Sequence, residues 1–226
     1  DVFAPAAAAV HDSWVDDEGT PYPGDFELTL HVTRAEDLEA LGVPAEPARD
    51  ALHAFVTAWG LDDTERLTSA ITDFSIHSKH PRAWVVDLGD GTLRWEPTIG
   101  HGIGSVAGDD PGVASVFSNT PTSEQSSLGL MRAAETYTGD FGYSMRLDGL
   151  EPGFNDNARR RAIVVHPDER NRPEVTASQG WLTPSRGCPT LDPATSRQVI
   201  DALSDGALMF FWYPDSTWRR GSTYLR

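Results

Sequence analysis

Two short stretches decide how this chain is interpreted: Ala162-Ile163-Val164-Val165-His166 and Ser185-Arg186-Gly187-Cys188-Pro189. The first is an apolar run of strand length that ends on a histidine. The second is a tight loop around the only cysteine among the 226 residues. Asp192 and Pro193 follow it, and these residue types suit the N-cap and the first position of a helix. The pattern predicts a strand that delivers the histidine, and a turn that presents the cysteine just before a helix.

A cysteine next to a histidine is the pairing that thiol acyl transfer needs. A free thiol has a pKa of about 8.5, so a neighbouring base or cation must raise its thiolate fraction. An imidazole titrates near neutrality and is the usual partner. Gly187 would let the backbone turn sharply, so that the amides of Gly187 and Cys188 could stabilise an oxyanion. A lone cysteine can equally be a buried packing residue, and the count alone does not separate the two readings.

Bulk composition restricts the possible partners. The formal net charge is −16, with 34 acidic and 18 basic residues, which argues against nucleic acid and anionic membrane surfaces. No run of about 18 apolar residues is present, so we expect no transmembrane segment. The chain starts at Asp1 without a secretory apolar core, and we interpret this start as a processed end. We expect no metal and no cofactor: His77 and His80 lack a second ligand pair, and the glycines at 102–104 precede no helix.

The pattern of apolar residues divides the chain in two. Residues 1–66 are expected to form an N-terminal extension with short helices, and residues 67–226 a β-rich catalytic domain. Strands are expected near 26–32, 70–74, 84–88, 92–99, 128–137, 143–147 and 207–213. The long loop at 100–126 is rich in Gly, Ser, Asp and Pro, and a loop of this length in a compact domain is usually functional.

The order of these features resembles a known family. Between His166 and Cys188 lie 21 residues (188 − 166 − 1), and a Ser-x-Gly-Cys motif then follows. This order resembles the catalytic signature of the L,D-transpeptidases. Residues 117–121, 126–129, 135–137 and 142–158 (Gly-Tyr-Ser-Met-Arg-Leu-Asp-Gly-Leu-Glu-Pro-Gly-Phe-Asn-Asp-Asn-Ala) are similar to the murein L,D-transpeptidase catalytic-domain family, which is related to YkuD. The resemblance runs from about Ala48 to Asp215 and leaves residues 1–45 outside.

The resemblance implies a fold, a reaction and a location. The fold would be mainly β: a YkuD-like β-sandwich with one helix after the cysteine and a small N-terminal α/β segment. Cys188 would attack the carbonyl of the third residue of a peptidoglycan tetrapeptide stem, with His166 as base, and D-Ala would leave. An amine from a neighbouring stem would resolve the thioester and form a 3→3 cross-link. Such an enzyme would work in the periplasm or cell envelope and would be a carbapenem target.

The resemblance also assigns candidate site residues. Ser185, Arg186 and Gly187 would shape the loop and the oxyanion site, although many family members have His where Arg186 stands. Pro167 replaces the usual Gly or Ser, but its backbone carbonyl could still orient the imidazole. We expect a cleft bordered by residues 100–126 and 142–157. The expected substrate-binding residues are His101, Ser118, Asn119, Tyr143, Arg146 and Asn155.

Several alternatives stay open from the sequence. Arg146 could pair with a stem carboxylate or simply hold its own loop, and the run Arg159-Arg160-Arg161 is interpreted as a solvated or strand-edge charge run. The same acyl-enzyme could be resolved by water, which would make a carboxypeptidase or endopeptidase. A wall-binding module with a silent site is a third possibility. The natural acceptor, the oligomeric state, the role of residues 1–45 and the source organism are not determined.

Overall fold

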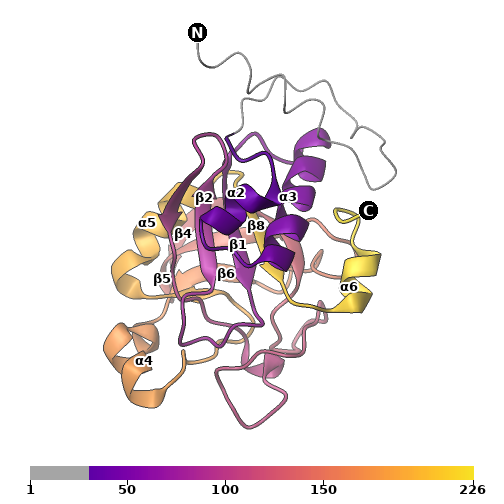
Figure 1. The fold of residues 1–226 in the computed structure, drawn as a ribbon. Helices are drawn as coiled ribbons and strands as arrows, with labels where there is room; N and C mark the ends of the chain where they lie inside the picture. The colour runs from indigo at the N-terminus through magenta and orange to yellow at the C-terminus, as the bar shows by residue number, and fades with distance from the viewer. Residues whose placement is uncertain (1–30) are drawn as a thin grey trace.

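The computed structural model describes residues 31–226, and most of the strand expected over 26–32 lies outside them. The described residues form one eight-stranded sheet with helices packed against it (Figure 1). Its strands are β1 (Thr68–Asp73), β2 (Ala83–Asp87), β3 (Thr92–Trp95), β4 (Gly129–Gly139), β5 (Gly142–Gly149), β6 (Val164–Pro167), β7 (Thr190–Leu191) and β8 (Leu208–Trp212). The α-helices are α2 (Ala35–Ala40), α3 (Ala45–Gly60), α4 (Pro173–Gln179), α5 (Pro193–Leu203) and α6 (Ser216–Gly221).

The mainly β architecture and the helix after the cysteine are confirmed. The strand order is β3-β2-β1-β8-β4-β5-β6-β7, so β8, near the end of the chain, lies in the middle. It pairs parallel to β1 and antiparallel to β4. All five residues of β8 are buried, as a continuous apolar run predicts for a strand covered on both faces. Short helices α4 and α6, which the apolar pattern did not reveal, complete the fold.

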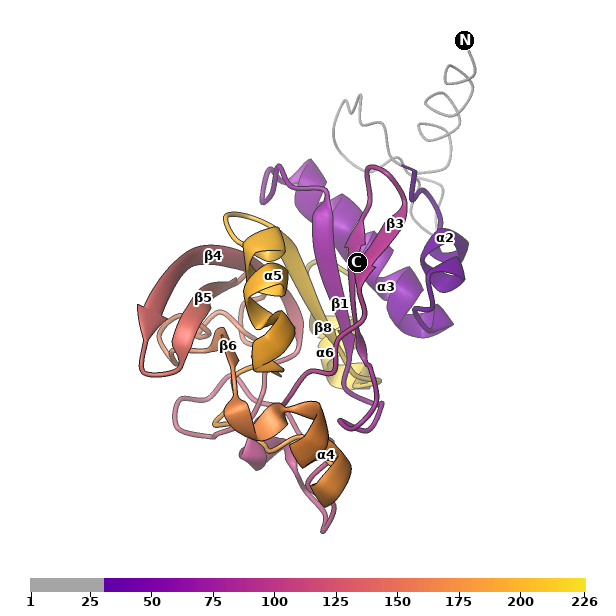
Figure 2. The ribbon, with the colours of Figure 1, turned by 90° about the vertical axis from the view of Figure 1, so that its left-hand side faces the viewer.

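The sheet curves around α5. This helix contacts β1 as well as the neighbouring strands β5 and β6, although β8 and β4 lie between β1 and β5 in the strand order. A flat sheet could not bring β1 and the β5–β6 pair to one helix. Figure 2 shows α5 between the β4–β5 hairpin and the β1–β8 pair, with α3 on the other side of β1 and β8. Asp192 caps α5 by accepting a hydrogen bond from the Ala194 N–H, and proline occupies its first turn. The chain therefore enters α5 at a fixed point, five residues after Cys188.

The N-terminal helices share their hydrophobic core with the sheet. The ring of Phe55 on α3 packs edge-on against Phe210 of β8, with centroids 6.3 Å apart. The indole N–H of Trp212 donates to a carboxylate oxygen of Asp50 at 2.8 Å. The buried apolar residues of the N-terminal segment, from Val32 to Ala58, belong to the same hydrophobic cluster as those of the strands. Among residues 31–226, no helix is long and apolar enough to cross a membrane.

Candidate active site

Strand pairing brings the two predicted stretches together. β6 and β7 run parallel with His166 opposite Thr190, and the His166 N–H donates to the Pro189 carbonyl at 3.3 Å. The loop before Cys188 is fixed by Ser185, whose hydroxyl donates to the Cys188 carbonyl at 2.7 Å. The Ser185 N–H in turn donates to the backbone carbonyl of His101 at 2.8 Å. The sulfur of Cys188 is thus set on a short, well-anchored turn at the edge of the sheet.

Gly187 is required by the shape of this turn. Its φ is +118°, a region that side chains rarely adopt. A Cβ atom there would lie 2.8 Å from the Gln125 carbonyl oxygen. The Gly187 N–H donates to the Ser185 hydroxyl at 3.1 Å, so in this conformation it is not free to bind an oxyanion, which differs from the expectation. The Cys188 N–H, by contrast, has no hydrogen-bond partner among the described residues.

The Cys188 thiol lies partly buried at the cavity wall. It donates to the backbone carbonyl of Ala162, with 3.6 Å between sulfur and oxygen. Ala162 has a positive φ of 55°, which is unusual for a residue other than glycine. Burial raises the pKa of the Cys188 thiol, whereas a backbone hydrogen bond at Val164 and the positive charge of Arg161 lower it. Burial is the largest of these effects, so the resting cysteine is mainly protonated.

His166 is held in one tautomer by its own neighbour. Its Nδ1 lies 2.8 Å from the Pro167 carbonyl oxygen, and because a carbonyl can only accept, Nδ1 carries the proton. Nε2 of the neutral ring is then an acceptor, and no hydrogen bond joins it to another described residue. Burial lowers the pKa of His166, with Arg170 acting in the same direction and the Pro167 carbonyl and Asp168 opposing it. The imidazole is therefore neutral at rest and has a free basic nitrogen.

One cavity contains both side chains. Its volume is about 760 Å³. The residues that line it are Ile103, Glu124, Phe141, Arg161, Ala162, His166, Arg170, Pro184, Ser185, Arg186 and Cys188. The loop at 100–126 borders the cavity as expected. The other expected border, residues 142–157, does not line it, and the tip of the β4–β5 hairpin stands there instead.

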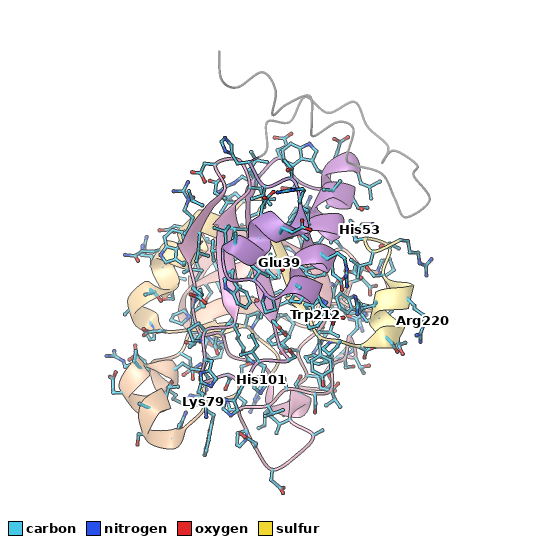
Figure 3. All side chains as sticks on the ribbon, in the orientation of Figure 1. Glu39, His53, Lys79, His101, Trp212 and Arg220 are labelled. Atoms are coloured by element: carbon cyan, nitrogen blue, oxygen red, sulfur yellow. The ribbon has the colours of Figure 1, made fainter. Side chains whose placement is uncertain are left out.

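His101 is a structural residue rather than a cleft residue. Its side chain is fully buried, within the lower part of the molecule in Figure 3. Nδ1 accepts a hydrogen bond from the buried guanidinium of Arg82 at 2.7 Å. Burial, together with the Arg82 charge, lowers the pKa of His101 to about 3, so the ring is neutral. The expectation that its side chain edges the cleft is wrong, because only its backbone carbonyl reaches the cysteine loop.

Ser118 and Asn119 line a different hollow of about 300 Å³, next to Trp218. The Asn119 side chain donates to Asp156 at 2.6 Å and accepts from the Asn157 N–H at 3.0 Å. These contacts join the 100–126 loop to the 150s turn. The two residues therefore line this second hollow and not the cavity that holds Cys188.

Tyr143, Arg146 and Asn155 also make structural contacts away from the cavity. The Tyr143 hydroxyl donates to Asp201 at 2.5 Å. Arg146 pairs with Glu135 at 3.2 Å and its guanidinium lies 4.4 Å from the Tyr137 ring centroid, so it makes structural contacts across the β4–β5 hairpin. The buried Asn155 amide donates to the carbonyls of Leu128 and Leu130. All three were expected to bind substrate, but none of them lines the cavity.

Arg186 lines the cavity mouth, where its side chain is 88% exposed and pairs with Glu124 at 3.4 Å. Phe141 and Arg161 are among the other lining residues that were not anticipated from the sequence. Phe141 is at the tip of the β4–β5 hairpin, and in a turn the alternation of apolar and polar residues no longer predicts where a side chain lies. Arg161 was assigned to a charge run, and that interpretation suits Arg159, which pairs with Glu135 and Asp148, but is wrong for Arg161.

Phe141 covers the histidine from the solvent side. Its ring stacks on His166 with centroids 4.3 Å apart and planes inclined by 26°. It is nevertheless 59% exposed, so its outer face is open. The ring contributes to the burial that keeps His166 neutral, and it forms an apolar lip beside the reactive nitrogen.

Replacing Phe141 by Ala should move the pKa of His166 upward, towards its ordinary value of 6.5, because water would reach the imidazole. The check is an NMR titration of the imidazole signals, with His166→Gln identifying the correct resonance. Phe141→Tyr keeps the aromatic ring and serves as the control, with an unchanged titration. An unshifted midpoint in the Ala variant would show that the strand and the Pro167 contact alone set the pKa.

No group of three or more His, Cys, Asp or Glu side chains that could hold a metal ion occurs within residues 31–226. A neutral base and a thiol that share one cavity define a cysteine–histidine site on a mainly β fold.

The family can be stated from a sequence comparison. A family model described as the L,D-transpeptidase catalytic domain matches residues 44–212, three quarters of the chain. The chain belongs to this family. A comparison with curated proteins gave no match.

Similar solved structures carry the same description. They include an L,D-transpeptidase from Mycobacterium smegmatis (15% identity, 65% of this chain and 59% of that chain, TM-score 0.40). Another is LdtMt1, an L,D-transpeptidase in complex with imipenem (14%, 65% and 59%, TM-score 0.39). A third is an L,D-transpeptidase from Stackebrandtia nassauensis (15%, 94% and 89%, TM-score 0.37). The match with the first two extends over about three fifths of their length, and the family assignment rests on the family model.

Proposed function

We propose that this protein is a peptidoglycan L,D-transpeptidase that forms 3→3 cross-links through a thioester on Cys188. The observation that carries the proposal is the pairing of Cys188 with His166 in one cavity, with the imidazole fixed by Pro167 so that Nε2 is free to accept a proton. Membership of the L,D-transpeptidase catalytic domain family supports the choice of substrate.

The reaction would proceed by two acyl transfers. His166 Nε2 takes the thiol proton while the Cys188 sulfur bonds to the carbonyl carbon of the third stem residue. The C–N bond to D-Ala then breaks, and the imidazolium returns the proton to the leaving amine. An amine from a second stem attacks the thioester and gives a proton to His166; the C–S bond breaks, and the released thiolate takes that proton from the imidazolium. The new amide bond is the cross-link.

The oxyanion would be bound by the Cys188 backbone. Its N–H has no partner among the described residues, whereas the Gly187 N–H is engaged with Ser185. An amide that points at developing charge can be worth about 3 kcal/mol in the transition state. Pro189 has no N–H, so this donor acts without help from the following residue.

The charge of the cavity favours an anionic peptide. Three arginines, Arg161, Arg170 and Arg186, line the wall, against one acidic residue, Glu124. The chain as a whole carries a net charge of −16, so this surplus of positive charge is local. Peptidoglycan stems carry free carboxylates, and guanidinium groups bind carboxylates with good geometry.

Incubation with purified tetrapeptide muropeptides and mass analysis of the products tests the proposal. The expected products are dimers with a 3→3 link and released D-Ala. Tripeptides without dimers would mean that water resolves the thioester, and the protein would then be an L,D-carboxypeptidase. An unchanged mixture, in a folded sample, would favour a wall-binding module.

The proposed substrate also sets the location. Peptidoglycan lies outside the cytoplasmic membrane, so we propose that the protein works in the periplasm or cell envelope. Fractionation of the producing cells with an antibody to the chain tests this, and recovery from the cytoplasm alone would contradict it.

A further inference from the structure

Arg161 is a guanidinium held in place by neutral groups. Its Nη1 donates to the Ser118 carbonyl at 2.7 Å and to the Ser127 hydroxyl at 2.6 Å. Its Nη2 donates to the Gln125 carbonyl at 2.5 Å and to the Ser123 hydroxyl at 3.2 Å. Four contacts to one short segment fix the head group, and none of them offsets its charge.

The other arginines of the cavity differ in this respect. Arg170 pairs with Asp168 at 2.6 Å, and Arg186 pairs with Glu124 at 3.4 Å. Arg161 forms no salt bridge with any carboxylate of residues 31–226 and is half-buried, which is costly for a charge that does not readily lose its proton. A positive charge placed in this way is typical of a site where an anion forms or binds.

The group in direct reach of this charge is the cysteine loop. Arg161 directly precedes Ala162, whose carbonyl accepts the Cys188 thiol. Its Nη2 lies 3.5 Å from the point where a side chain on Gly187 would begin. Burial lowers the pKa of Arg161, and the thiolate form of Cys188 is the one charge that acts in the opposite direction.

We propose that Arg161 is the fixed cation that stabilises the Cys188 thiolate when His166 removes the thiol proton. This inference rests on the proposed function, in which Cys188 is the nucleophile. The proton passes from sulfur to His166 Nε2, and Arg161 neither gains nor loses a proton. The negative charge is then shared between two cations, one permanent and one formed in the step.

This assignment differs from a resting thiolate–imidazolium pair. Burial lowers the pKa of His166, and its Nδ1 is engaged with a neutral carbonyl, so the ring carries no charge before the reaction. The imidazole thus supplies no permanent positive charge at the sulfur, whereas the guanidinium of Arg161 is placed to supply one.

The single cysteine makes a direct test possible, because iodoacetamide can alkylate no other thiol in the chain. Below the thiol pKa, the alkylation rate is proportional to the thiolate fraction. At pH 8 we expect Arg161→Gln to react about tenfold more slowly than the unmodified protein, the effect of one unit in pKa. Arg161→Lys, which keeps the charge, should stay within about threefold of the unmodified rate.

Two further variants make the result specific. Arg160→Gln removes an adjacent exposed charge and should leave the rate unchanged. His166→Gln should also leave it within about twofold, because the neutral imidazole contributes no permanent charge. A loss in His166→Gln equal to that in Arg161→Gln would make the imidazolium the counterion and overturn the proposal.

Unfolding of the Arg161→Gln variant would raise the alkylation rate, whereas loss of the cation in a folded variant lowers it. An unfolded Arg161→Gln variant, recognised by circular dichroism, would expose an ordinary thiol and react faster; the decision then falls to Arg161→Lys and His166→Gln. An unchanged rate in folded Arg161→Gln, with weaker muropeptide binding, would instead assign Arg161 to a substrate carboxylate and sink the proposal. The alkylation assay needs no muropeptide, so it tests this inference separately from the proposed function. If the proposed function alone is wrong, no cross-linked product forms, while the variants still show the expected alkylation rates.

Discussion

Replacing Cys188 by Ala should reduce cross-link formation at least about a thousandfold, because no other group in the cavity can form the thioester. The same variant should form no covalent adduct with a carbapenem, whereas the unmodified protein gains the mass of one molecule. Intact-mass measurement with and without the antibiotic gives both results. The fold should be unchanged, since the hydrogen bonds of the thiol are to backbone groups of Ala162 and Val164.

Cys188→Ser is the matched control for this prediction. It preserves the volume of the side chain and a hydrogen-bond donor, but its hydroxyl does not ionise near neutral pH. We expect it to be as inactive as the Ala variant and as stable as the unmodified protein. A carbapenem adduct that persists in either variant would show that another residue is the nucleophile.

Replacing His166 by Gln should lower kcat/KM about 10²- to 10⁴-fold, the usual contribution of a positioned general base. Glutamine can still reach the Pro167 carbonyl with its amide, so the local hydrogen bond need not be lost. The thiol remains in place, and slow acylation by a carbapenem should persist. Activity equal to that of the unmodified protein would exclude His166 as the base.

The pH dependence provides a second check on His166. Because burial lowers its pKa, the acidic limb of kcat/KM should lie below pH 6.5, the ordinary value for histidine. The same shift links protonation to stability. The unfolded chain binds the proton first as pH falls through 6.5, so the free energy of unfolding decreases towards the lower folded pKa. His166→Gln should remove this part of the acid sensitivity, measured as the difference in urea midpoint between pH 7 and pH 5.

The sequence predicted those helices and strands that are determined by residues close to one another in the chain. The apolar run at 207–213 indicated a buried strand, and Asp192-Pro193 marked the start of α5. The same reasoning located the cysteine and the histidine, because each follows a short, distinctive pattern. These features depend on neighbours within a few residues and on the alternation of buried positions.

The cavity wall could not be predicted in this way. Arg161 has the same two arginine neighbours in sequence whether it is solvated or half-buried, and the 118–127 segment that surrounds it is more than 30 residues away. From the sequence, Phe141 is only a residue at a hairpin tip; its stacking on His166 of β6 depends on the folded position of the hairpin. His101 looks like a cleft residue because it follows a strand, but its ring turns inward to Arg82. Each of these depends on how distant segments fold back on one another.

The contacts of α3 have a consequence for how this molecule loses its structure. Phe55 and Asp50 tie the helix to β8, the central strand, and β8 supports β4, which in turn positions the hairpin that carries Phe141. Helix and sheet cannot separate without exposing the same apolar surface, so they should melt as one cooperative unit. A substitution that disrupts α3 should therefore unfold the whole protein, including the Cys188 turn at the edge of the sheet, rather than change the activity of a folded enzyme.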